Sequence, residues 1–124
     1  MKFIKRSYAG VKEILKTRDF EAIGVMVDGT GIATNSDGFK IVPAGTIVGG
    51  KTKPALANDG EVVVSKNTED TGADAEGVLL HDVDVTHGDA PGSMVIRGNI
   101  DLAKIEKPVD EVQAALKGRI LFIK

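Results

Sequence analysis

Short apolar segments separated by glycine-containing turns constrain the fold of this 124-residue chain more than any other feature. The segments are rich in β-branched residues and occupy positions 22–27, 39–42, 46–48, 62–64, 78–85 and 94–96. Turn signals lie between them, at Asp28-Gly29, Asp37-Gly38, Gly49-Gly50, Asn58-Asp59-Gly60 and Pro91-Gly92. Gly tolerates positive φ and Pro fixes φ near a turn value, so each signal favours a chain reversal. This pattern predicts a mainly β chain that folds as a small β-barrel or β-sandwich.

A helix is expected near the end of the chain, at residues 108–117, followed by a last strand at residues 119–123. Pro108 suits the first helical turn, and Asp110 complements the positive pole of a helix. Gly118 is placed to end the helix in the left-handed conformation. After it, apolar side chains alternate between two faces, as in a strand that joins the sheet.

Residues 66–77 hold no large apolar side chain, and we expect them to form an exposed loop outside the core. The chain length fits one domain with appendages. Cysteine is absent, which excludes disulfides and thiolate metal sites as sources of stability. No segment approaches the roughly eighteen apolar residues of a membrane span and none is of signal-peptide type, so we expect synthesis in the cytoplasm and no membrane contact.

Charge is distributed unevenly along the chain, although the net charge is only -2. Residues 1–18 carry six Lys and Arg side chains against Glu13 alone, whereas residues 58–89 carry nine Asp and Glu side chains against Lys66 alone. The first eighteen residues lack strand alternation, and their helical spacing lasts for about one turn. We interpret residues 1–18 as an extended basic arm that orders on binding, and residues 19–124 as a β-rich domain.

The sequence at residues 25–31 is similar to the Asp-Thr-Gly loop of dimeric aspartic peptidases, because an apolar segment precedes Asp28, Thr30 and Gly31. Gly29 is an inserted residue that would displace the Thr and Gly that orient the carboxylate in such a loop. A glycine-rich hairpin turn accounts for the same residues. Phosphate-binding loops and serine-nucleophile motifs do not occur in the sequence. We therefore predict that the protein is not an enzyme.

The densest group of potential metal ligands consists of His81, Asp82, Asp84, His87 and Asp89. In a continuous strand, alternation places the two histidines on one face and Asp82 with Asp84 on the other. The histidines would also lie about 20 Å apart, because each strand residue advances about 3.3 Å. We predict no cofactor and no metal site, leaving open only a Ca²⁺ at Asp82 and Asp84, and we expect His81 to be a half-buried sheet residue.

Four segments carry a resemblance to a known family: TRDFEA at residues 17–22, VPAGTIVGG at 42–50, GVLLHDVDV at 77–85, and IDL at 100–102 leading into the closing helix. In these segments and in the order of its elements, the chain resembles the head decoration proteins of tailed bacteriophages, the family of the lambda head protein D. The resemblance covers roughly residues 17–124 and rests on the pattern of elements rather than on a catalytic signature.

The resemblance implies a β-domain that forms a homotrimer on the outer surface of the expanded phage head and fastens subunits of the major capsid protein. The protein would then belong to the virion exterior and have no nucleic-acid partner, because packaged DNA lies inside the shell. The basic arm suits strand addition to a capsid subunit, since backbone pairing requires an extended segment and little sequence specificity. Its expected capsid-binding residues are Lys2, Phe3, Ile4, Lys5, Arg6, Tyr8 and Val11.

The alternative function is a virion-displayed module that binds carbohydrate or a host surface. Such a site usually needs an exposed aromatic platform. Tyr8 belongs to the arm, and Phe20, Phe39 and Phe122 occupy expected strand positions, so the sequence offers no evident platform.

Overall fold

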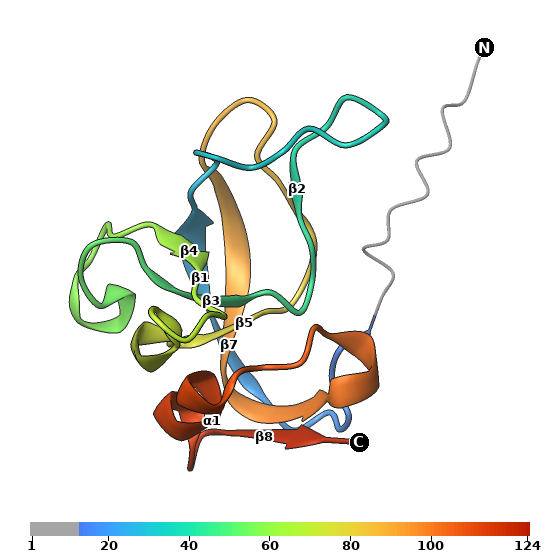
Figure 1. Cartoon of the computed structure of the whole chain (residues 1–124), viewed down its shortest axis with the longest axis vertical. Helices are drawn as coiled ribbons and strands as arrows, with labels where there is room; N and C mark the ends of the chain where they lie inside the picture. Colours follow the sequence, from blue (N-terminus) through green and yellow to red (C-terminus); the bar gives the residue numbers. More distant parts are fainter. Residues whose placement is uncertain (1–12) are drawn as a thin grey trace.

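The computed structural model describes residues 13–124 and confirms a mainly β fold with one α-helix near the end of the chain (Figure 1). The strands are β1 Glu21–Val27, β2 Ile41–Val42, β3 Ile47–Gly50, β4 Val63–Ser65, β5 Gly77–Leu79, β6 Val83–Asp84, β7 Ala90–Asp101 and β8 Ile120–Ile123. The helices are α1 Asp110–Leu116 and the short 3-10 turns η2 Ala55–Ala57, η3 Gly72–Asp74 and η4 Leu102–Lys104. The seven residues expected to bind the capsid lie outside the described residues.

Six strands form one sheet in the order β1-β4-β3-β5-β7-β8, and β1 also pairs with β7. The additional pairing closes β1, β4, β3, β5 and β7 into a ring, so this part of the molecule is a small barrel. β8 lies outside the ring, parallel to the second half of β7, while β2 and β6 form a separate two-stranded sheet.

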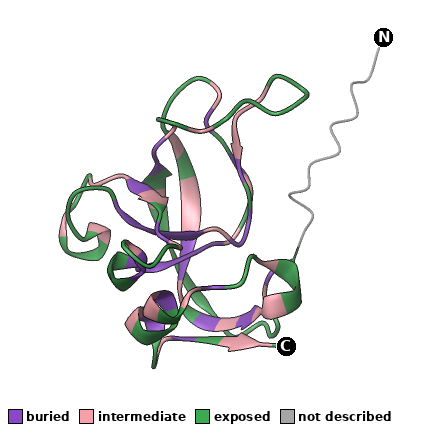
Figure 2. Ribbon diagram, viewed as in Figure 1, coloured by how far each residue is buried: buried purple, intermediate pink, exposed green. Residues whose placement is uncertain are grey.

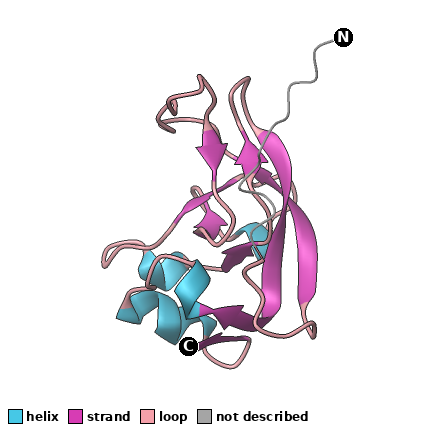
Figure 3. Ribbon diagram, turned by 90° about the vertical axis from the view of Figure 1, so that its right-hand side faces the viewer, coloured by secondary structure: helices cyan, strands magenta, loops and turns pink. Residues whose placement is uncertain are grey.

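β7 connects the barrel to the end of the chain, and Figure 3 shows it with β1 as a long two-stranded ribbon at one side of the molecule. Its first part pairs antiparallel with β1, and its last part, from Gly98 to Asp101, pairs with β8. Between them the register shifts, because Ala22 faces Val95 whereas Glu21 faces Arg97. The extra residue, Ile96 of β7, forms a β-bulge. A bulge bends its strand, and this one turns β7 from the barrel toward β8.

Two hydrophobic cores lie on opposite faces of the central strands. Figure 2 shows buried residues along these strands in purple. Adjacent residues point in opposite directions, so Val78 packs in one core and Leu79 in the other. The helix-side core consists of Ile14, Ala44, Ile47, Ala75, Val78, Val95, Ile100, Val112, Leu116 and Ile120. The barrel core consists of Val27, Val42, Val48, Val63, Leu79, Val83, Val85 and Met94.

The folded body includes Ile14 and therefore does not start after Arg18. Ile14 is fully buried in the helix-side core, and its carbonyl accepts the Asp101 N–H at 2.8 Å. Leu15 forms an isolated antiparallel bridge with Ile100. Residues 13–18 contain no helical turn, so they extend along β7 as part of the domain and not as an arm.

The prediction that residues 66–77 form an exposed loop outside the core is wrong. Ala75 belongs to the helix-side core, and η3 packs against α1. A Cβ added to Gly72 would lie only 2.8 Å from the Glu111 Cβ. Small residues therefore allow a close approach between η3 and α1, a role that a search for large apolar side chains does not reveal.

The single strand expected at residues 78–85 is divided into β5 and β6 by a bend. Within this bend, the Asp82 carboxylate accepts the Ala44 N–H at 2.7 Å. This bond draws the chain away from the large sheet, and β6 then pairs with β2 instead. His81, expected to be half-buried, is exposed in the bend.

Two expected turns are strand segments. Gly49 and Gly50 are buried within β3, and an added Cβ would collide with the Asp74 carbonyl at Gly49 and with the Lys53 carbonyl at Gly50. Pro91 and Gly92 belong to β7. Glycine is thus needed in β3 for close backbone approach rather than for chain reversal.

The closing helix and strand are as the sequence predicts. α1 lies within the expected range, and Gly118, which follows the C-cap residue Lys117, has φ of 89°. β8 then runs along β7. Among residues 13–124, no helix is long and apolar enough to cross a bilayer.

Candidate functional site

The potential metal ligands near residues 81–89 are separated in the structure. The Asp82 carboxylate binds the Ala44 N–H, and the Asp84 carboxylate accepts a hydrogen bond from the Thr86 hydroxyl. Asp89 accepts the Gly29 N–H at 3.1 Å from a different part of the chain. Within residues 13–124, no three His, Cys, Asp or Glu side chains are placed to share a metal ion.

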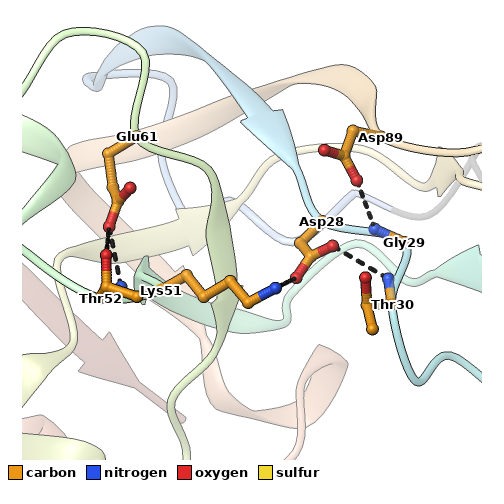
Figure 4. Close-up of polar contacts among 7 residues, drawn as sticks. All are labelled: Asp28, Gly29, Thr30, Lys51, Thr52, Glu61 and Asp89. Carbon is orange, nitrogen blue, oxygen red and sulfur yellow. Dashed lines mark hydrogen bonds and ion pairs between the residues drawn. The ribbon is translucent and has the colours of Figure 1, made fainter.

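Asp28, the residue of the peptidase-like sequence, is buried at the end of β1 (Figure 4). One carboxylate oxygen lies 2.8 Å from the Lys51 Nζ, and the other accepts the Thr30 N–H at 3.0 Å. The Lys51 ammonium, followed by the Thr30 N–H, holds the pKa of Asp28 well below its ordinary range. The same contact with Asp28 raises the pKa of Lys51. Both carboxylate oxygens are therefore occupied by contacts within the chain.

These contacts fasten the barrel where β1 meets β4. The two strands share a single residue pair, Val27 with Val63, and the Asp28 N–H extends this pairing to the Val63 carbonyl at 3.0 Å. Beside it, Glu61 accepts the Thr52 N–H at 2.8 Å, which is the main cause of its lowered pKa. The contacts of Asp28 thus have a structural role, because they hold the chain in place where β1 and β4 close the barrel.

A second buried carboxylate, Glu76, was not singled out by the sequence. Its oxygens accept the N–H groups of Gly50 at 2.6 Å and of Ala55 and Leu56 at 2.8 Å each. The side chain thereby holds the loop between β3 and η2 in place. A cavity of about 260 Å³ lies beside it, in which three lysines are accompanied by Asp74 and Glu76.

The outer edge of β1 is an accessible apolar surface of the described chain. Between Glu21 and Met26, β1 pairs with β7 on one side and has no strand partner on the other. Residues 22–26 contain no charged residue and no proline. Ile23 and Met26 are 36% and 41% exposed, and Phe20, directly before the strand, is 36% exposed. We call residues 20–26 the β1 edge.

An open groove of about 540 Å³ lies at the start of this edge. Its walls combine apolar Leu15 and Phe20 with basic Lys16 and Arg18. Residues 1–12 join the domain here, because Ile14 is the first buried residue of the described chain. We call the surface formed by residues 13–20 the N-terminal groove.

No family model matches this chain, and no curated protein matches it. The function of this chain is therefore inferred from its sequence and from the geometry of the domain.

Sequence reasoning missed both the β1 edge and the role of Glu76. The uncharged run at residues 22–26 was recognised as a strand, but the sequence does not show which edge of a strand lacks a partner. The Glu76 carboxylate accepts the N–H of Gly50, which is more than twenty residues away in the sequence. A local sequence pattern cannot predict such a contact.

Proposed function

We propose that this chain is a phage head decoration protein, a non-enzymatic subunit that binds the outside of the expanded capsid and bridges subunits of the major capsid protein. Residues 1–12 and the N-terminal groove would provide the capsid contact. The protein would act as a homotrimer on the virion exterior, with no nucleic-acid or membrane partner.

The main support for this proposal is that the basic N-terminal segment is attached next to a buried residue of the folded domain. Residues 1–12 contain Lys2, Lys5, Arg6 and Lys12 and no acidic residue. Glu13 follows them, and the next residue, Ile14, is fully buried and hydrogen-bonded to β7. A binding segment attached to a core residue transmits a capsid contact directly to the domain, as a bridging subunit requires.

The polar clusters support a binding role rather than a chemical one. Asp28 and Glu76 both direct their carboxylates to partners within the chain. For the carbohydrate-binding alternative, no aromatic platform gathers within residues 13–124, where Phe20 is exposed while Phe39 and Phe122 are half-buried.

Deletion of residues 1–12 tests the proposal. We expect the truncated protein to stay folded, because Ile14 is retained, and to lose binding to expanded phage heads in a co-sedimentation assay. Alanine at Lys2, Lys5 and Arg6 should weaken binding, more strongly at low salt, since exposed charges are screened as salt rises.

A matched variant carries alanine at Lys104, Lys107 and Lys117, three exposed lysines of the closing region. It removes the same charge and should bind heads normally. Equal binding by the truncated and full-length proteins would contradict the proposal.

A further inference from the structure

Lys66, directly after β4, is a buried lysine whose ammonium group has no partner within residues 13–124. The residue is only 8% exposed, although lysine is seldom buried so far unless it is paired. Its backbone N–H donates to the Ile47 carbonyl at 2.9 Å, but its side chain forms no hydrogen bond and no ion pair in the described chain. Burial of an ammonium group without a partner is unfavourable, so the position needs an explanation.

The side chain of Lys66 extends toward a cavity of about 260 Å³ that the residue lines together with Gly50 and Ala75. Its stem passes over the buried Gly49 of β3, with the Cγ atom 3.2 Å from the position that a Cβ would take there. Within residues 13–124, every side-chain N or O atom that is fully buried has a hydrogen-bond partner. The Lys66 nitrogen therefore keeps contact with solvent, and the cavity is where this contact occurs.

Two other charged side chains of the cavity are already engaged in contacts within the chain. The Lys51 ammonium is bound to the Asp28 carboxylate at 2.8 Å (Figure 4). Both oxygens of Glu76 are occupied by three backbone N–H groups. Neither Lys51 nor Glu76 is thus available to neutralise Lys66.

The remaining charges of the cavity, Lys53 and Asp74, are exposed. Glu61 attracts Lys53 from outside the cavity lining. Asp74 forms no ion pair with Lys66, and water screens an exposed carboxylate, so it does not replace a hydrogen-bonded partner. The charges around the cavity nearly balance, and what Lys66 lacks is an acceptor in direct contact.

We propose that this cavity binds a small oxyanion, a phosphate or a carboxylate, which accepts a hydrogen bond from the Lys66 ammonium. Such a bond between two charged groups is about twice as strong as one between neutral groups. The cavity is smaller than the roughly 300–1,000 Å³ pockets of drug-sized ligands, so a single ion or one acidic side chain suits it. A metal cation suits it less well, because Lys66 would repel the cation.

Titration of the full-length protein with inorganic phosphate, and separately with acetate, tests the site. Chloride keeps the ionic strength constant, because added salt alone screens exposed charges. We expect the amide NMR signals of Gly50, Lys66 and Ala75 to shift and to reach saturation. Absence of saturable binding with both anions would overturn the proposal.

Lys66→Met retains most of the buried stem and removes the ammonium group. Its affinity for phosphate should be lower by about tenfold or more, as expected for the loss of a hydrogen bond between charged groups. Lys104→Met is the matched control, because Lys104 is exposed and lies outside the cavity lining, and its affinity should be unchanged. Asp74→Asn should bind phosphate more tightly than the native chain, since it removes a like charge beside the anion. This last test does not depend on the folding of a Lys66 variant.

Two further results would contradict an anion site. Shifts that increase without saturation, or that appear equally at exposed lysines elsewhere, would indicate an adventitious ion only. Equal affinity of the native chain and a folded Lys66→Met would mean that Lys66 only covers Gly49 and extends its charged end to water, as buried lysine stems often do.

Binding of Lys66→Met to expanded phage heads identifies the source of the oxyanion, and only this step rests on the proposed function. Weaker head binding would assign the oxyanion to an acidic side chain of the capsid, whereas unchanged head binding would assign it to a free ion. The titration contains no capsid, so its failure leaves the head-binding proposal standing. Failure of the native chain to bind heads would remove that proposal and leave the titration result unaffected.

Discussion

At the Asp28 carboxylate, burial and charge pairing act in opposite directions. Burial penalises the ionised form, whereas the Lys51 ammonium and the Thr30 N–H stabilise it, and the lowered pKa of Asp28 shows that the partners prevail. The sequence singled out Asp28 through its similarity to a peptidase loop and favoured a glycine-rich hairpin turn in its place. Its partner Lys51 is more than twenty residues away, so the motif contained no sign of the ion pair.

Asp28→Asn should destabilise the domain at neutral pH by about 1–3 kcal/mol, because a hydrogen-bonded charge is lost from a buried position. A carboxyl group whose pKa is lowered by folding stabilises the folded state. This stabilisation is fully present above the pKa of the group in the unfolded chain, about 4, and is lost as the pH falls below that pKa. The variant should therefore lose less stability than the native chain between pH 7 and about pH 3. Urea unfolding at both pH values measures the difference.

Asp37→Asn provides the comparison, since Asp37 is exposed in a loop. Its pH dependence should match that of the native chain. An unchanged pH dependence in Asp28→Asn would show that the Asp28–Lys51 pair contributes little to folding.

At the level of the elements, the sequence was informative wherever local rules decide the structure. β1 and α1 follow from apolar periodicity and from the end signals at Pro108 and Gly118. The bend between β5 and β6 could not be predicted in this way, because the Asp82 contact with Ala44 spans 38 residues. The length of β7 also escaped prediction, since Pro91 is a turn signal in local terms and here lies within a strand.

Gly72→Ala should destabilise the domain by about 1–3 kcal/mol, because the new methyl group would push η3 away from α1. Gly24→Ala is the matched variant, as an added Cβ in that position meets open space. Thermal unfolding should separate the two substitutions, with a clear decrease in Tm for Gly72→Ala alone. Equal Tm values would mean that α1 shifts to accept the methyl group without cost.

For the whole molecule, the position of Ile14 determines how much of the N-terminus can be removed. The sequence placed the end of the arm at Arg18, which includes a core residue in the arm. The error arises because burial of Ile14 depends on β7 and α1, which lie at the other end of the chain. The division between arm and body therefore required the tertiary structure.

Two truncations make this boundary measurable. Removal of residues 1–12 should leave the free energy of unfolding nearly unchanged. Removal of residues 1–16 deletes the Ile14 side chain, whose loss from a core costs about 2–5 kcal/mol, together with its backbone bond to Asp101. Chemical denaturation compares the two proteins, and equal stability would place the boundary where the sequence suggested.

The alternating packing of β5 also affects cooperativity. Val78 and Leu79 are neighbours in the chain but support different cores, so a displacement of this strand disturbs the packing on both sides. Neither half can loosen independently while β3, β5 and β7 remain common to both. We therefore expect the barrel and the closing helix to melt as one unit, and a weakened contact at α1 to be transmitted to residues inside the barrel.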